Sequence, residues 1–359
     1  MKVFQLIQKP QLRGAEIFAC QLSNNLLLNG HDVLLISIFK GNANLPIHGP
    51  IVHLNRPISL RLFDFEGWRK LADLIKTERP DILQANAGDT LKFAIFSKLF
   101  FGWKVPIIFR NASTISQYIK NPFVKAFNKF LLGRSNYIIS VSQFSKNDIN
   151  ALYPVTRSKS EVVPIGINLP NIKNDIRSEN ELIIAHVGGF TFEKNHSGVI
   201  RIFEKINSND SNTKLWLIGD GPKYDEMIQL VKQKGLTDCI QFKGYVNNPM
   251  EYIAQSDVLV LPSRIEGLPS VILEAQYCRT PVVAYNVGGI SEIVENGKTG
   301  WLIEKGNEAG FARVVVEVLK GQNETICENA YRQVVAKFDN QEITQRFVYA
   351  YKKVISEPK

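Results

Sequence analysis

The sequence is poor in cysteine and histidine, and the spacing of the few that are present argues against several kinds of site. Its 359 residues contain four cysteines that lie far apart, with no C-x-x-C pair. This pattern favours buried reduced thiols over a zinc site or a disulfide framework. The five histidines are scattered, and no D-x-D triplet occurs. Because metal sites need clustered ligands, we expect a protein that holds no metal.

Long hydrophobic runs are also missing. No segment reaches the ~18 consecutive apolar residues that a membrane-spanning helix needs. The start, MKVFQLIQKP, is typical of a strand rather than of a cleaved signal. With 45% hydrophobic and 21% charged residues, the composition is that of a globular protein, and we expect it on the cytosolic side. The length predicts two domains.

Acidic residues are absent from one stretch of the first half. Residues 1–170 carry 21 Lys and Arg against 10 Asp and Glu, whereas the remaining residues carry 22 against 24. Between Thr90 and Asn147 nine cations occur without a single acid, and aromatic residues are interleaved with them. The nine cations are Lys92, Lys98, Lys104, Arg110, Lys120, Lys125, Lys129, Arg134 and Lys146.

Three interpretations of this basic, aromatic stretch compete. Cations attract anionic headgroups and partly inserted rings bury apolar surface, so residues 90–147 predict peripheral contact with the inner face of an anionic membrane. A solvated helix face above ordinary core phenylalanines is the next alternative. A platform for single-stranded nucleic acid is less favoured, and we expect no nucleic-acid partner.

Apolar runs alternate with helical patterns along the whole chain, which is typical of parallel sheets. The first half predicts strands at 3–7, 32–38, 81–84, 105–109 and 136–141, and helices at 14–29, 66–78, 88–101 and 122–132. The second half predicts strands at 181–187, 214–218, 240–242, 257–261 and 281–284.

The fold class is therefore α/β, with two Rossmann-like domains that face each other across a cleft. We place the first domain at 1–168 and the second at 178–340, with a polar linker near 166–180. Helical spacing near the end predicts a final helix at 341–359. Parallel sheets bind ligands beyond the carboxyl ends of their strands, so the chemistry should lie in strand-to-helix loops.

One such loop, Lys9 to Glu16, has Gly14 just before a predicted helix. A glycine there lets a ligand approach the backbone, and the free N–H groups of the helix start favour a phosphate. Many helices begin after a glycine, so this signal is weak by itself. The dinucleotide fingerprint G-x-G-x-x-G is missing, which disfavours a dehydrogenase.

A second loop, Leu261 to Ser270, carries a stronger signal. Pro269 suits the first turn of a helix, so the N–H groups of Gly267 and Leu268 would lie at its mouth, where an anion binds well. Glu266 in the loop and Glu274 in the helix could bind two parts of one ligand, because a carboxylate accepts hydrogen bonds from sugar hydroxyls. The alternative is that these glutamates only complement the helix dipole.

A series of short motifs along both halves of the chain resembles the pattern of a known protein family. In the second half they are Val187-Gly188-Gly189-Phe190 with Glu193-Lys194-Asn195, Gly219-Asp220-Gly221-Pro222, Gly244-Tyr245-Val246, Glu266-x7-Glu274 and Val287-Gly288-Gly289 through Gly300-Trp301-Leu302. In the first half, Arg13-Gly14-Ala15-Glu16, Gly30-His31-Asp32-Val33, Pro80-Asp81-Ile82 and residues 162–168 match more loosely. In order and spacing the chain resembles the GT-B glycosyltransferases of family 4, also called group 1.

The resemblance implies a nucleotide-sugar donor, with UDP or GDP, held mainly by the second domain, and an acceptor held by the first. It also implies that the final helix, 341–359, returns to the first domain. Lys194 matches the phosphate-binding lysine and Glu274 the glutamate that binds the ribose. Glu266, with the N–H groups of Gly267 and Leu268, would hold the transferred sugar. Gly14 would approach the same diphosphate, and the region around Val246 would seat the base.

The resemblance also implies transfer with retained anomeric configuration, without a metal or other cofactor. In the usual interpretation, the departing phosphate takes the acceptor proton on the same face of the sugar, while Glu266 and Lys194 position and stabilise. A metal-free enzyme must neutralise the leaving diphosphate with protein groups.

Some residues depart from the family pattern. Gly189 stands where the family usually has an arginine that binds phosphate, and Arg264, one loop away, is a candidate substitute. Histidines are missing after two first-domain strands, so Arg110, Asn111 and Ser113 become the candidate acceptor contacts. His31 and His186 are interpreted as structural.

We therefore expect a glycosyltransferase that acts on a lipid-linked or surface-polysaccharide precursor. A nucleotide-sugar epimerase on the same fold is one alternative. A non-catalytic subunit that binds a nucleotide sugar is another, because the arginine is missing at Gly189.

Overall fold

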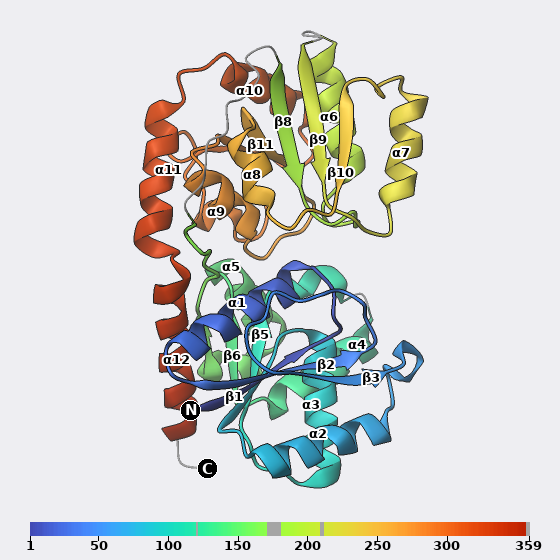
Figure 1. Cartoon of the computed structure of the whole chain (residues 1–359), viewed down its shortest axis with the longest axis vertical. Coiled ribbons are helices and arrows are strands. Elements are labelled where there is room, and N and C mark those ends of the chain that lie inside the picture. The colour runs from blue at the N-terminus through green and yellow to red at the C-terminus, as the bar shows by residue number, and fades with distance from the viewer. Residues whose placement is uncertain (120, 171–180, 209–211, 357–359) are drawn as a thin grey trace. The chain divides into compact units, whose positions relative to one another are not determined.

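The computed structural model describes residues 1–119, 121–170, 181–208 and 212–356. Within it the chain forms two compact units, shown in Figure 1. The first comprises Met1–Asn168 together with Asn340–Lys359, and the second comprises Leu169–Asp339. Most of the linker expected near 166–180 lies outside the described residues.

The first unit is a seven-stranded parallel sheet in the order β3-β2-β1-β4-β5-β6-β7. Its strands are β1 (Lys2–Ile7), β2 (Asp32–Phe39), β3 (Ile51–Arg56), β4 (Ile82–Ala85), β5 (Ile107–Asn111), β6 (Tyr137–Ser140) and β7 (Ser160–Val162). Its helices are α1 (Gly14–Leu28), α2 (Phe65–Glu78), α3 (Gly88–Phe101), α4 (Pro122–Arg134), α5 (Gln143–Leu152) and α12 (Asn340–Ser356), with short 3-10 turns η1 (Ile58–Leu60), η2 (Ile115–Tyr118) and η3 (Pro154–Lys159).

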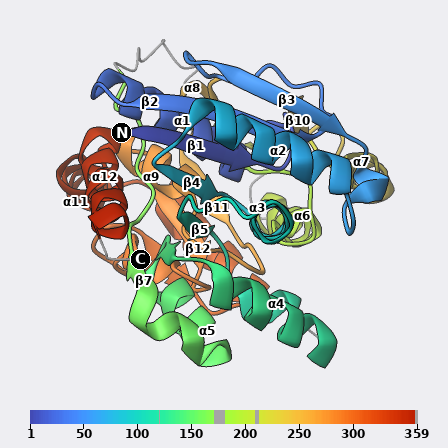
Figure 2. The same ribbon diagram turned by 90° about the horizontal axis from the view of Figure 1, so that it is seen from below.

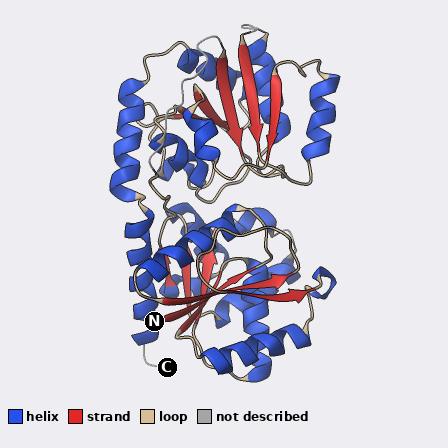
Figure 3. Ribbon diagram, in the orientation of Figure 1, coloured by secondary structure: helices blue, strands red, loops and turns tan. Residues whose placement is uncertain are grey.

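The second unit is a six-stranded parallel sheet in the order β10-β9-β8-β11-β12-β13. Its strands are β8 (Leu182–Val187), β9 (Thr213–Ile218), β10 (Ile240–Gly244), β11 (Val258–Leu261), β12 (Val282–Tyr285) and β13 (Trp301–Ile303). Its helices are α6 (His196–Asn207), α7 (Tyr224–Gln233), α8 (Pro249–Ala254), α9 (Ser270–Tyr277), α10 (Glu308–Leu319) and α11 (Glu324–Lys337), with the 3-10 turn η4 (Ile290–Glu292). Figure 3 shows each sheet among its helices.

Alternation along β1 shows why the sheet is covered on both faces. Phe4 and Leu6 join the core beneath α2 and α3, whereas Ile7 packs with Ala19 and Cys20 of α1 on the other side. In Figure 2 helix α2 crosses in front of β1 and β2. Because successive side chains of a strand point to opposite faces, one apolar run supplies both cores.

The predicted strands and helices form close to their expected bounds, and the two parallel sheets confirm the α/β fold class with two Rossmann-like domains. Sequence patterns missed β3, β7 and β13. The strands β7 and β13 have three residues each and lie at sheet edges. Such short, half-buried segments do not make a recognisable apolar run. Among the described residues, no helix has the length and apolar character needed to cross a bilayer.

Helix α12 is attached to the first unit by polar contacts in the interior. The Tyr351 hydroxyl donates to Gln84 Oε1 at 2.6 Å and accepts from Gln5 Nε2 at 3.2 Å. Asn86 closes the network, donating to Gln5 Oε1 and accepting from Gln84 Nε2, each at 2.9 Å. Phe347 of α12 also packs on Phe18 of α1, with ring centroids 5.6 Å apart. Buried polar groups therefore specify where α12 docks.

We predict that Tyr351→Phe lowers the free energy of unfolding by ~1–3 kcal/mol, because the buried Gln84 Oε1 and Gln5 Nε2 atoms each lose their hydrogen bond to the hydroxyl. The measurement is urea unfolding. Tyr349→Phe is the matched control on the same helix, because Tyr349 is 70% exposed, and its unfolding curve should match that of the parent protein. Equal stability of the two variants would contradict the role given to this network.

Candidate active site

The loops that carry most of the predicted residues lie at one edge of the second sheet. They follow the parallel strands β8, β9, β10, β11 and β12, whose carboxyl ends share an edge. Figure 1 shows β8, β9 and β10 ending on the same side of this unit. Ligands bind to open parallel sheets at this edge, so the fold gathers the motifs where chemistry is expected.

Lys194 and Glu266 are in direct contact. Lys194 Nζ lies 2.7 Å from Glu266 Oε1, although the two residues are 72 positions apart. The Lys194 side chain is 23% exposed and the Glu266 side chain is 9% exposed. Lys194 precedes α6, and Glu266 lies between β11 and α9. The pair therefore joins the first and fourth loops of the edge.

Close backbone packing holds these loops together, and it requires glycine at two positions. Gly219 has φ +138°, and a Cβ there would lie 2.1 Å from the Gly188 carbonyl oxygen. Gly288 has φ +59°, and a Cβ there would lie 2.0 Å from the Glu266 carbonyl oxygen. Neither position can accept a side chain without moving backbone. The loop after β12 is thus packed directly against the backbone of Glu266.

Further contacts link the loop of Lys194 to that of Arg264. Arg264 N donates to the Glu193 carbonyl at 2.7 Å, and Asn195 Nδ2 donates to the Pro262 carbonyl at 2.9 Å. Arg264 Nε donates to Asn195 Oδ1 at 3.0 Å, and its guanidinium lies 4.6 Å from the centre of the Phe192 ring. The guanidinium therefore lies beside the loop that carries Lys194.

Glu274 extends the site along α9. This helix begins at Ser270, so Pro269 is the residue before the helix rather than part of its first turn as the sequence predicted. No side chain caps the start of α9. Burial raises the pKa of Glu274 above 4.5, partly offset by its hydrogen bond with Ser270 and by the charge of Lys194. The ammonium group of Lys194 thus interacts electrostatically with both carboxylates, forming an ion pair with Glu266 and acting on Glu274 through its charge.

The remaining residues predicted in this unit lie on the same edge. Val246 follows β10 and is partly buried, and its neighbour Tyr245 is 45% exposed. Gly267 accepts a hydrogen bond from Gly289 N at 2.9 Å, and Leu268 is 7% exposed. A Cβ at Gly189 would make only ordinary contacts, the nearest at 3.6 Å. The fold therefore leaves room for a side chain where the family arginine is missing.

A buried histidine pair lies behind Lys194. The His196 ring stacks on Phe190, with centroids 3.8 Å apart, and meets the His186 ring edge-on at 4.7 Å. His186 Nδ1 lies 2.9 Å from the Val260 carbonyl. Burial lowers the pKa of His186 to about 4 and that of His196 to about 2, and Lys194 adds to both shifts. The sequence did not indicate this pair, because the two rings meet only when α6, which begins at His196, packs on β8, which carries His186.

The candidate residues of the first unit are in different environments. Gly14 begins α1, and a Cβ there would meet no atom within 4 Å. Arg110 and Asn111 are adjacent on β5, at 3% and 1% exposure. Arg110 lies over Phe18 of α1, whereas Asn111 Nδ2 donates to the Ser145 carbonyl of α5. They therefore point to opposite faces of the sheet, while Ser113 is partly exposed beyond the strand.

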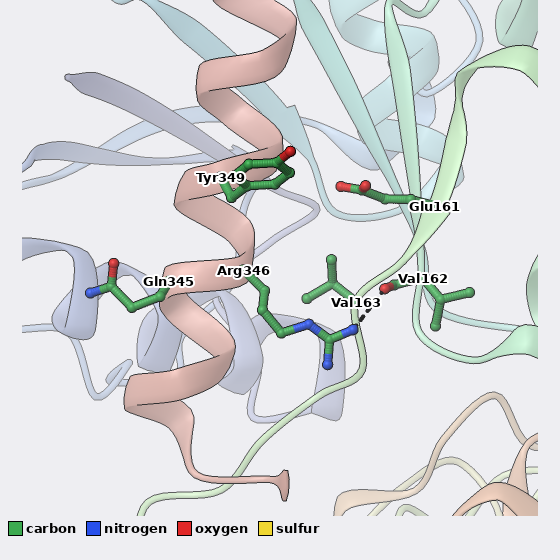
Figure 4. A pocket seen from close by; sticks show the side chains of 6 residues that line it. All are labelled: Glu161, Val162, Val163, Gln345, Arg346 and Tyr349. Carbon is green, nitrogen blue, oxygen red and sulfur yellow. Dashed lines mark hydrogen bonds between the residues drawn. The ribbon is translucent and has the colours of Figure 1, made fainter.

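A separate surface pocket of about 290 Å³ lies between β7 and α12 (Figure 4). Arg346 Nη2 donates across it to the Val162 carbonyl at 3.0 Å. None of the predicted residues lines it. In the described part of the chain, no three His, Cys, Asp or Glu side chains are grouped so that they could hold a metal ion.

Two family models match consecutive parts of the chain. The model described as Glycosyltransferase Family 4 matches residues 12–170, and the model described as Glycosyl transferases group 1 matches residues 170–333. The chain belongs to this glycosyltransferase family. It is thus an enzyme of the GT-B type, as the motifs predicted.

Individual relatives agree with this assignment. The N-acetyl-alpha-D-glucosaminyl L-malate synthase of Bacillus anthracis is 26% identical, over 98% of this chain and 96% of its own. The N-acetylgalactosamine-N,N'-diacetylbacillosaminyl-diphospho-undecaprenol 4-alpha-N-acetylgalactosaminyltransferase of Campylobacter jejuni is 28% identical, over 58% of this chain and 59% of its own. The Anabaena HepE structure in complex with UDP and glucose has the same fold, with a TM-score of 0.84, 20% identity and coverage of 98% of this chain and 100% of its own.

From the burial of the histidine pair, we expect the stability of this glycosyltransferase to fall in acid. Both histidines have a pKa below the ordinary 6.5 in the folded chain, so below pH 6.5 the unfolded chain binds more protons and stability falls as the pH is lowered. We predict that His196→Phe, which keeps a ring against Phe190, flattens the loss of stability between pH 6.5 and 5. The measurement is the unfolding midpoint in urea at each pH. His48→Asn, at an exposed position, should keep the original slope, and an unchanged slope in His196→Phe would refute the assignment.

Proposed function

We propose that this glycosyltransferase moves a sugar from a UDP- or GDP-sugar to a lipid-linked or surface-polysaccharide precursor, with retention and without a metal. The second unit would hold the donor and the first unit the acceptor. A relative whose name specifies a diphospho-undecaprenol acceptor supports the lipid-linked class. HepE, which shares the fold and was solved with UDP and glucose, supports a uridine nucleotide sugar.

The contact between Lys194 and Glu266 is the observation that carries the proposal. A donor contains a dianionic diphosphate next to a hydroxyl-rich sugar, and the site offers an ammonium group 2.7 Å from a carboxylate. The ammonium group is suited to the diphosphate and the carboxylate to sugar hydroxyls. Glu274 supplies a second carboxylate for the ribose, and the N–H groups of Gly267 and Leu268 add donors near the sugar.

The transfer breaks the bond between the anomeric carbon and the diphosphate oxygen, and the electron pair leaves with the diphosphate. The acceptor hydroxyl bonds to the same face of the sugar, and its proton goes to the departing phosphate oxygen. Lys194 stabilises the charge that develops on the leaving group, and Glu266 positions the sugar. Gly14 at the start of α1 and Arg264 beside Lys194 are proposed as further diphosphate contacts, and Val246 as a base contact. Arg110, Asn111 and Ser113 are proposed on the acceptor side.

Two of the nine cations in residues 90–147 are buried, so the proposed membrane surface is smaller than the whole stretch. Lys92 is 9% exposed and bonded to Asp89 at 3.1 Å, and Arg110 is 3% exposed, so neither belongs to a lipid-facing surface. Lys120 lies outside the described residues. Helix α4 is the most suitable part of the stretch for a membrane contact, because only Leu131 and Leu132 of its thirteen residues are buried.

Exposed rings and cations alternate along α4. Phe123 is 83% exposed and Phe127 is 40% exposed, with Lys125 and Lys129 exposed between and after them. A helix whose exposed face carries apolar rings, cations and no acid fits the headgroup region of an anionic leaflet. We therefore propose that α4 rests on the inner face of the membrane, where a lipid-linked acceptor is presented.

We predict that Lys194→Ala and Glu266→Ala each remove most of the transfer, by ~10²-fold or more, because each loses a group that acts on the transition state. The measurement is product formation from a panel of UDP- and GDP-sugars, with the products identified with and without acceptor. Lys234→Ala is the matched control, because Lys234 forms a 2.6 Å ion pair with Glu204 elsewhere in the same unit. Parent-level turnover in the first two variants, or release of an epimerised donor, would refute the proposal.

We predict that Lys125→Gln combined with Lys129→Gln weakens binding to vesicles of 30% anionic lipid by ~30-fold, since each cation contributes ~1 kcal/mol near such a surface. The measurement is sedimentation with vesicles at low salt. Lys305→Gln combined with Lys337→Gln removes the same charge from exposed positions of the second unit and should leave binding unchanged. Equal binding by both double variants would rule out α4 as the contact.

A further inference from the structure

Arg110 is a buried cation with unsatisfied donors. Its side chain lies at the end of β5 and is 3% exposed. Its Nε and Nη1 atoms are buried and have no hydrogen-bond partner among the described residues. The guanidinium carbon lies 3.7 Å from the centre of the Phe18 ring, which covers one side of the plane. The N–H groups of Nε and Nη1 are thus left for a partner that the described residues do not supply.

Arg56 shows how the same unit pairs a buried arginine. Its side chain is 9% exposed, and its Nε lies 2.9 Å from Asp64 Oδ2. A second hydrogen bond runs from Nη2 to Asp64 Oδ1 at 2.9 Å. A buried charge is costly unless it is paired in this way. Burial lowers the pKa of Arg110 to about 9, as expected for a guanidinium without such a pair.

Glu16 is the nearest candidate counter-ion, but it is bonded elsewhere. It lies in the first turn of α1 at 3% exposure and accepts a hydrogen bond from Gln11 Nε2 at 3.0 Å. The charge of Glu16 acts on Arg110 without a hydrogen bond between the two side chains. Burial raises the pKa of Glu16, and the hydrogen bond from Gln11 partly offsets this shift. Glu16 therefore does not satisfy the guanidinium.

The position of Arg110 indicates which kind of group pairs with its guanidinium. It lies at the carboxyl end of β5, next in the sheet to β4, and this edge of a parallel sheet is where ligands bind. An oxyanion of phosphate or carboxylate matches two adjacent N–H groups of a guanidinium. We infer that Arg110 binds an anionic group of the acceptor, a phosphate or a carboxylate.

This inference rests on the proposed transfer reaction for the identity of the ligand, but binding of an anion at Arg110 can be measured without it. The probes are inorganic phosphate and malonate, titrated in thermal-shift and calorimetric experiments with no donor present. Lys194→Ala serves as the background, because it removes the cation proposed to bind the donor diphosphate. In that background, Arg110→Met should raise the Kd of at least one probe by ~10- to 100-fold, the loss expected for hydrogen bonds to a charged group.

The stability of the single variants separates a binding role from a structural one. Arg110→Met should leave the Tm unchanged or raise it, because it removes an unpaired buried charge, whereas Arg56→Met should lower it. Glu16→Gln should tighten binding of the probe, because a nearby negative charge is lost. A preference for phosphate or for malonate then tells which anionic group the acceptor carries.

Two results would overturn the inference. One is equal binding of both probes with and without Arg110. The other is a fall in Tm for Arg110→Met as large as that for Arg56→Met, which would make Arg110 part of the framework. Donor hydrolysis without acceptor tests the proposed reaction separately. If hydrolysis is normal in Arg110→Met while the KM for acceptor rises, the residue acts on the acceptor.

Discussion

The ion pair of Lys194 and Glu266 is the contact on which the proposed donor site depends. It joins two loops whose residues are 72 positions apart, and it places opposite charges 2.7 Å from each other. A nucleotide sugar has an anionic diphosphate and a hydroxyl-rich sugar. The ammonium group is suited to the diphosphate, and the carboxylate is suited to the sugar hydroxyls. A donor of that kind exchanges one internal contact for two external ones. The site is therefore organised before the ligand arrives.

The loops can make this contact because they approach at backbone distance. At Gly219 and Gly288 a single added carbon would collide with the carbonyl oxygen of the neighbouring loop. The histidine pair and Phe190 fill the space behind Lys194 with stacked rings. The stacked rings and the close backbone contacts at the two glycines fix the loop that carries Lys194. The same packing buries two histidines in their neutral form, and acid sensitivity is its consequence.

The first unit carries polar and apolar groups that its own fold leaves unsatisfied. Arg110 is buried without the pairing that Arg56 has, and α4 exposes the rings of Phe123 and Phe127. Marginally stable proteins rarely keep such features without a functional reason. An anionic acceptor and a membrane surface are the partners that would satisfy them, and a charged acceptor carried on a lipid would bring both together.

The sequence by itself determined the parallel sheets, most of their strands and helices, and the loops that carry the proposed donor residues, because apolar periodicity and glycine placement are local properties. It did not predict β7 or β13, which are too short to form a pattern, and it counted Lys92 and Arg110 as surface cations. Only the tertiary structure decided which cations are exposed, that Lys194 meets Glu266, and that Phe18 covers Arg110. The physical reason is that burial and pairing depend on elements distant in the chain, such as α1, whose Phe18 covers Arg110 of β5, and α12, whose Tyr351 bonds to β1 and β4. No local sequence pattern records those neighbours.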